Sequence, residues 1–219
     1  MVTQSELITE VTRIIQDTSY SDATQLSFIN QAVQDIAGDP RVLLPDLETS
    51  DDVDTSTDDS YVSLPSDYQK NLTDCYNTDK YCHHKIYGSL ETLQRDFYHL
   101  DQNGYIVGVA VSGSNLHYQR IPSTSETLTL HYYRVPTDMS DDDDEPDGLP
   151  AHLAKPLIVH HACAAIFSEI EQDLQGQKVN TQYHEGKFNE YLSKLIGFIG
   201  PVATSPISIN EEMDWEVYL

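Results

Sequence analysis

The chain has 219 residues, which suits one elaborated domain or two small ones, and its hydrophobic content of 39% is that of a globular protein. Its 36 acidic and 12 basic residues give a formal net charge of −24, so it lacks the lysines and arginines that bind a nucleic-acid backbone, and anionic membranes repel it as well. We expect no signal peptide, no membrane span and no disulfide scaffold, because no basic segment precedes an apolar one at the start, no apolar run approaches about 18 residues, and the three cysteines are scattered.

The first 45 residues predict two short helices joined by a tight turn. Apolar side chains recur at helical spacing over residues 5–16, with Ser5 as the candidate N-cap, and again over residues 23–37. Ser21 or Asp22 can cap the second helix. Two short helices joined in this way favour an antiparallel pair.

Residues 46–148 predict a β-rich insert. Short tyrosine-bearing runs occupy its first half, and Ser89 can cap a short helix that follows them. Three stronger strand patterns come next, at residues 105–111, 116–121 and 127–135. In the last of these, apolar and polar residues alternate, which is typical of a sheet with one solvated face.

The C-terminal third predicts two more helices, over residues 151–174 and 179–198. We therefore expect an α+β fold in which a four-helix bundle forms from two helix pairs, with a β-rich insert and an extended C-terminal tail. The expected divisions are residues 1–45 and 149–198 for the helix pairs, 46–148 for the insert and 199–219 for the tail.

The acidic residues concentrate in three segments that contain no basic residue. Residues 46–59 and 138–147 carry seven acids each, and four more lie in the tail. None of the segments has helical or strand periodicity, so we expect solvated loops or tails. Such charge either keeps a surface soluble, for example in salty water, or lines a surface that DNA must pass without sticking.

The order and spacing of these elements resemble the head-to-tail adaptors, also called connector or head completion proteins, of tailed bacteriophages. The resemblance covers most of residues 1–198. It is carried by five stretches: Ser5-Glu6-Leu7-Ile8, residues 27–37, Leu64-Pro65-Ser66-Asp67-Tyr68, His131-Tyr132-Tyr133-Arg134 with the rest of 128–136, and Leu149-Pro150-Ala151-His152.

This resemblance implies a structural virion protein without catalysis or cofactor. Such adaptors form a homo-oligomeric ring, usually of twelve copies, that docks under the portal protein, extends the DNA channel and provides the attachment site for the tail or tail-terminator proteins. Double-stranded DNA would pass through without specific binding, and no membrane would be involved. The expected location is the neck, or connector, of the virion, with the host cytoplasm as the place of assembly.

Two sets of residues are candidates for contacts in such an assembly. The aromatic end of the tail could bind the portal, as C-terminal segments of adaptors commonly do, although it could instead pack on its own bundle; its residues are Trp215, Val217, Tyr218 and Leu219. One of the two acidic loops could line the DNA channel, although both could instead lie outside and merely solubilise; the candidate residues are those of the second segment, Asp141, Asp142, Asp143, Asp144 and Glu145.

Dedicated metal sites and catalytic sites are not expected, while weak divalent-ion binding by an acidic loop stays open. The cysteines and histidines at residues 75–84 and 160–163 lack the tight paired spacing of zinc ligands, so packed thiols and hydrogen-bonded histidines are the competing interpretation. A calcium loop that starts at Asp143 places Gly148 correctly at its sixth position but ends at Ala154, where a glutamate is needed. Phosphate-loop, dinucleotide and serine-hydrolase motifs are missing.

The sequence is also compatible with two other functions. The leading rival is a soluble, cytoplasmic binding module whose acidic surface contacts a basic protein partner. An enzyme of unknown type is a more distant alternative. Electron microscopy of the purified chain, alone and with a portal, separates a ring subunit from both.

Overall fold

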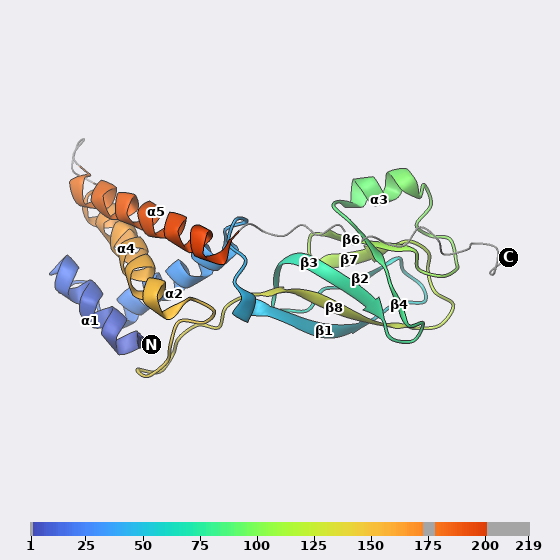
Figure 1. Ribbon diagram of the computed structural model, residues 1–219, viewed down its shortest axis with the longest axis horizontal. Coiled ribbons are helices and arrows are strands. Elements are labelled where there is room, and N and C mark those ends of the chain that lie inside the picture. Colours follow the sequence, from blue (N-terminus) through green and yellow to red (C-terminus); the bar gives the residue numbers. More distant parts are fainter. Residues whose placement is uncertain (1, 173–177, 201–219) are drawn as a thin grey trace. The chain divides into compact units, whose positions relative to one another are not determined.

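The computed structural model describes residues 2–172 and 178–200, and the chain divides into two compact units. We call them the helical unit, residues 2–49, 67–70 and 133–200 without 173–177, and the sheet unit, residues 50–66 and 71–132. The described residues form five α-helices and two four-stranded sheets (Figure 1), which confirms the α+β class.

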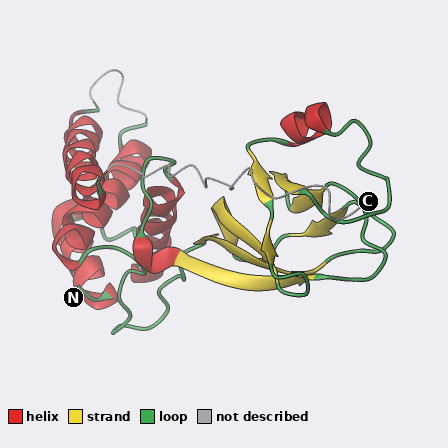
Figure 2. Ribbon diagram, turned by 45° about the vertical axis from the view of Figure 1, so that its right-hand side comes forward, coloured by secondary structure: helices red, strands yellow, loops and turns green. Residues whose placement is uncertain are grey.

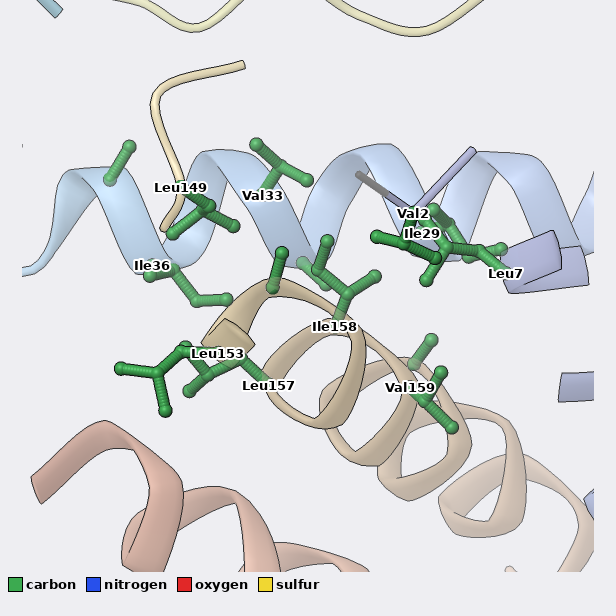
Figure 3. Packing of buried hydrophobic residues seen from close by; sticks show 14 of the residues in the cluster. Val2, Leu7, Ile29, Val33, Ile36, Leu149, Leu153, Leu157, Ile158 and Val159 are labelled. Atoms are coloured by element: carbon green, nitrogen blue, oxygen red, sulfur yellow. The ribbon is translucent and has the colours of Figure 1, made fainter. Parts of the chain in front are cut away.

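Four helices make up most of the helical unit: α1 (Gln4–Ile15), α2 (Asp22–Gly38), α4 (Ala151–Ile170) and α5 (Val179–Ile199). Helix α4 packs extensively against each of the other three, whereas α5 has its main contact with α4 alone. The predicted four-helix bundle is thus not shown as a regular bundle, because α4 lies in the middle, between α2 and α5 (Figure 3).

The core of the helical unit is built around α4. Ile158 points from α4 toward Ile29 and Val33 of α2 (Figure 3), and Ile158 and Ile29 have no exposed surface. Burial of each such side chain contributes about 1.5–3 kcal/mol. By length and composition alone α4 could cross a membrane, but nine of its residues are buried, and this packing accounts for its apolar sequence.

The helix starts follow local capping chemistry. Ser21 caps α2, as predicted, and its hydroxyl accepts a hydrogen bond from the Thr24 amide at 3.3 Å. The predicted cap of α1 was wrong, because α1 begins one residue before Ser5 and the Thr3 hydroxyl accepts from the Glu6 amide. Both Thr3 and Ser5 are good cap residues, so the sequence pattern left the first turn ambiguous.

The sheet unit contains two sheets and the short helix α3 (Leu90–Asp96), which Figure 2 shows in yellow and red. One sheet has the order β1-β8-β3-β4, and the other has the order β2-β7-β6-β5. The strands are β1 (Glu48–Asp54), β2 (Tyr61–Ser63), β3 (Tyr68–Asn77), β4 (Cys82–His83), β5 (Lys85–Tyr87), β6 (Gly108–Ser112), β7 (Asn115–Tyr118) and β8 (Thr127–Arg134).

The first acidic segment was wrongly predicted as a loop, because residues 48–54 form the edge strand β1 and residues 45–47 form a short 3₁₀-helix. Threonine hydroxyls of β8 hold two of its carboxylates: Thr127 donates to Asp54 at 2.9 Å, and Thr129 donates to Asp52 at 2.6 Å. The acidic side chains stay exposed, which discourages another strand from pairing with this edge.

Strands β6, β7 and β8 agree more closely with the strands predicted from the sequence. The hairpin between β6 and β7 turns at Gly113, whose φ of 60° favours glycine. Leu128, Leu130 and Tyr132 of β8 are buried in alternation, as predicted. The strand predicted at residues 105–111 begins only at Gly108, and it is preceded by a single bridge between Asn103 and Ile121.

Candidate assembly surfaces

The second acidic segment, residues 138–147, forms neither helix nor strand, as predicted, but its neighbours hold it in place. The Gln4 and Ser5 amides at the start of α1 donate to the carbonyls of Asp144 and Asp142, at 2.8 and 3.1 Å. These amides have no partner within their own helix. The acidic segment therefore completes the first turn of α1 with its backbone rather than with its carboxylates.

Asp144 organises the segment from within. Its carboxylate accepts from the amides of Ser140 and Asp141, at 2.7 and 2.8 Å. The hydrogen bonds from the Asp141 and Ser140 amides lower the pKa of Asp144. Of the five residues expected to line a channel, Asp144 thus has a structural role, while Asp141, Asp142, Asp143 and Glu145 are exposed.

Asn30 of α2 fixes the beginning of the segment. Its side-chain amide donates to the Met139 carbonyl at 3.0 Å, and its carbonyl oxygen accepts from the Met139 amide at 3.1 Å. The Met139 side chain is buried in the core of the helical unit. Gln34, one turn further along α2, donates to Asp138 at 2.6 Å. The segment is therefore anchored on α2.

Asp147 fixes the end of the segment. Its carboxylate accepts from the Arg134 guanidinium at 2.6 and 3.1 Å and from the Thr137 amide at 2.9 Å. Desolvation would raise the pKa of Asp147, but these hydrogen bonds keep it below its usual value. Gly148 follows with φ of 75°, and a Cβ there would lie 2.7 Å from Leu47. A close packing contact therefore ends the segment.

Hydrogen bonds also hold the backbone of Asp58 and Asp59, the exposed acids that follow β1. The Tyr118 hydroxyl, which is buried, donates to the Asp59 carbonyl at 2.9 Å and accepts from the Ser56 amide at 2.8 Å. The Ser56 hydroxyl accepts from the amides of Asp58 and Asp59. The backbone of both acidic segments is therefore held in place by hydrogen bonds.

The cysteines and histidines of the β3–β4 hairpin do not converge. Asn77 pairs with Cys82 and Tyr76 with His83, so His83 lies on the opposite face from its neighbours. His83 contacts Asp74 at 2.9 Å, whereas His84 is buried. Desolvation raises the pKa of the buried Cys75 thiol to about 12, which makes it a poor metal ligand.

The histidines and cysteine of α4 separate in the same way. His160 faces His184 of α5, while His161 lies 3.2 Å from the Asp35 carboxylate of α2. Cys163 is buried, and desolvation raises its pKa to about 12. Across residues 2–172 and 178–200, no three His, Cys, Asp or Glu side chains are grouped so that they could hold a metal ion.

Two further polar residues have roles that the sequence pattern does not predict. Lys70 donates through Nζ to the carbonyls of Asp39 and Val42, both at 2.6 Å, and to that of Ala37 at the end of α2. Glu171, directly after α4, accepts from the hydroxyl and amide of Thr181 and from Asn180 in the first turn of α5. Lys70 thus connects β3 to the end of α2, and Glu171 connects the end of α4 to the start of α5.

The other predicted contact surface cannot be placed. Residues 201–219, with Trp215, Val217, Tyr218 and Leu219, lie outside the described residues, as does most of the tail predicted from residue 199.

Comparison with known proteins identifies the family. No curated protein matches the chain. The family model described as SU10 adaptor protein matches residues 2–206, which include both units. The resemblance to head-to-tail adaptors that the element order indicated is thereby confirmed, and with it a structural role among the head and tail proteins of a bacteriophage virion. The chain belongs to the SU10 adaptor protein family.

Proposed function

We propose that this chain forms a ring, of twelve copies by analogy with other adaptors, that docks under the portal, extends the DNA channel and provides the attachment site for tail or tail-terminator proteins. The observation that carries the proposal is the family match over residues 2–206. The ring would lie in the neck of the virion and assemble in the host cytoplasm. It would act by positioning surfaces, without chemistry.

The channel wall is assigned to the second acidic segment. Asp141, Asp142 and Asp143 are exposed on a loop whose backbone is tied to α1 and α2. A fixed negative wall repels the phosphate backbone, so DNA moves past without being held. Glu145 belongs to the same surface, whereas Asp144 supports it through the hydrogen bonds described above.

Charge reversal tests the channel assignment. Replacing Asp141, Asp142 and Asp143 with Lys leaves Asp144 and the loop backbone intact, so the ring should still form while DNA passage slows or stops. The matched variant with Asn at the same positions should have a smaller effect, because it removes repulsion without adding attraction. Packaging and ejection at the parent rate in the Lys variant would exclude this loop from the channel.

Portal docking is assigned to the tail. Trp215 is the single tryptophan of the chain, and Val217, Tyr218 and Leu219 follow it at the C-terminus. Aromatic anchors of this kind dominate many interfaces. Deletion of residues 213–219 should abolish co-purification with the portal but leave ring formation unchanged. Portal binding that persists after the deletion would instead place the contact on the described units.

Each of the four predicted segments has a role in the proposed ring. Residues 1–45 and 149–198 would supply the helices of the ring body, residues 46–148 the insert, and residues 199–219 the portal-binding tail. A ring that forms from the purified full-length chain, alone or on its portal, supports the proposal in negative-stain images and mass measurement. A chain that stays monomeric under both conditions would contradict it.

A further inference from the structure

Helix α5 has an outer face that no described residue covers. Its buried residues face α4, and on the opposite side the positions 179, 183, 186, 190, 193 and 197 follow one another at helical spacing. Val179 is 64% exposed and Tyr183 is 57% exposed, which is unusual for apolar or aromatic residues this close together. Because α5 packs mainly on α4, this face remains open among residues 2–172 and 178–200.

Two glycines on the same face point to close approach by another element. A Cβ at Gly186 or Gly197 would meet no described atom within 4 Å, so the packing of the described residues does not require glycine at either position. Glycine weakens a helix interior relative to alanine, and it is favoured where another backbone comes near. Helix α5 therefore offers a shallow face, flanked by Tyr183, for a packing partner.

Helix α2 carries a groove on the other side of the helical unit. Ala23, Ser27, Asn30 and Gln34 line it at helical spacing, together with Leu26, Gln31 and Asp138, and its volume is about 340 Å³. Apart from Leu26, which also packs against the core, the α2 residues among these lie on the side of the helix away from the buried Ile29 and Val33. The groove and the outer face of α5 are thus separated by α4.

The charges of the two faces are complementary. Helix α2 contains Asp22 and Asp35 and no basic residue, and Asp138 borders its groove. Three lysines lie in or directly before α5, and two of them flank its outer face: Lys187 and Lys194, whose ammonium groups lie 2.9 and 2.7 Å from the Glu190 carboxylate. Against Glu185 and Glu190, the two acids of α5, the three lysines leave a net excess of one positive charge, in a chain with 36 acidic and 12 basic residues.

We propose that the outer face of α5 in one subunit packs into the α2 groove of the next copy of the chain. Two different, complementary faces on opposite sides of a subunit make a head-to-tail contact, and such contacts close into a ring when the rotation permits. The proposal rests on the ring function above and names the interface that builds it. Lys187 and Lys194 would then lie near the acids that border the groove.

A bulky side chain at Gly186 tests the contact. Gly186→Leu has open space around it, so the subunit should fold with an unchanged or raised Tm, but the leucine should hold the next subunit away and reduce rings to less than a tenth of the parent level. Asn189→Leu is the matched control, because it adds the same side chain at an exposed position of the same helix, about 80° around the axis from the centre of the outer face. It should assemble like the parent.

Cross-linking gives a second readout that does not depend on loss of assembly. Chains with Cys82→Ser and either Tyr183→Cys or Ser27→Cys are mixed and treated with a short bismaleimide. Covalent dimers should form in the mixture and not from either chain alone. Asn189→Cys in place of Tyr183→Cys should give few dimers.

The outcomes separate this interface from the ring itself. Rings of Gly186→Leu at the parent level, or rings without dimers in the mixture, would overturn the interface and leave the ring function standing. Absence of rings from the parent chain, alone and with the portal, would overturn both.

Discussion

The Nδ1 atom of His160 in α4 lies 2.9 Å from the Nδ1 atom of His184 in α5. At this distance one imidazole must donate a proton and the other must accept it, so at least one ring is neutral. Phe167 stacks on His184 and Tyr191 stacks on His160, while Tyr183, Lys187 and Glu190 are the titratable neighbours from α5. Since α5 packs mainly on α4, this pair lies at its principal attachment.

The pair makes stability depend on pH. Desolvation lowers the pKa of both histidines, and a nearby positive charge lowers each further, that of Lys187 for His160 and that of His160 for His184. The unfolded chain therefore binds more protons than the folded one below about pH 6.5, so stability is full above that pH and falls as acid is added. Each histidine changes the free energy of unfolding by at most about 1.4 kcal/mol per pH unit.

The measurement is urea unfolding of the parent and of His160→Asn/His184→Asn at several pH values from 8 to 5. The double variant should lose less stability on acidification than the parent. His84, whose pKa is lowered to about 4 by desolvation, is common to both proteins and cancels in the difference. Parallel curves for the two proteins would show that the pair does not control the transition.

Lys70 should be important for stability although it is a single polar residue. Its ammonium group donates to three carbonyls near the end of α2, and burial lowers its pKa. Lys70→Met keeps the apolar stem but leaves those carbonyls without the donor, so we expect a loss of about 2 kcal/mol in the free energy of unfolding. Urea unfolding measures it.

Lys85→Met serves as the control for Lys70→Met. Lys85 is exposed and lies over the Tyr87 ring, 4.5 Å from its centroid, so its replacement should change the free energy of unfolding by less than about 0.5 kcal/mol. Equal effects of the two substitutions would contradict the role given to Lys70.

The sequence predicted the helices well because their patterns are local. The apolar content of α4 and the cap at Ser21 act within one element, so both helices were located. Helix α4 nevertheless ends at Ile170 rather than at residue 174, and it is buried on several sides rather than along one stripe, because three helices pack around it. The strand β1 was missed because its residues are mostly acidic, and its hydrogen-bonding partner β8 lies more than 70 residues further along the chain. Long-range pairing overrode the local signal.

The assembly surfaces could be predicted only in part. Residues 138–147 were identified by charge alone, and their loop conformation follows from it. Their fixed geometry depends on Asn30 and Arg134, which bind across long sequence separations and look like ordinary surface residues. The separation of Asp144 from its exposed neighbours likewise depends on backbone geometry that composition does not encode.

Asn30 should be needed for the placement of the acidic segment. Asn30→Asp keeps the acceptor for the Met139 amide but replaces the donor with an oxygen that faces the Met139 carbonyl. We expect a loss of about 1–3 kcal/mol in the free energy of unfolding and faster proteolysis near residue 140. Ser27→Asp adds the same charge on the exposed side of α2 and should leave the proteolysis rate at the parent value.

Glu171 should secure the start of α5. The N-cap position, Lys178, has no side-chain hydrogen bond, and the Glu171 carboxylate instead accepts from Asn180 and Thr181. Desolvation would raise the pKa of Glu171, but these hydrogen bonds lower it, so the residue is charged near neutral pH, where its charge also suits the positive end of the helix dipole.

Glu171→Gln turns one acceptor into a donor that faces the donors of α5, so the Tm should fall and amide exchange in the first turn of α5 should speed up at least tenfold. Glu185→Gln removes the same charge from an exposed position of α5 and should change neither quantity. Because Glu171 already carries its charge at pH 7, the difference between the two variants should shrink as the pH falls through the pKa of the Glu171 carboxyl. If the difference in Tm between the two variants stayed constant down to pH 3, the shape of the Glu171 side chain, rather than its charge, would determine its contact with α5.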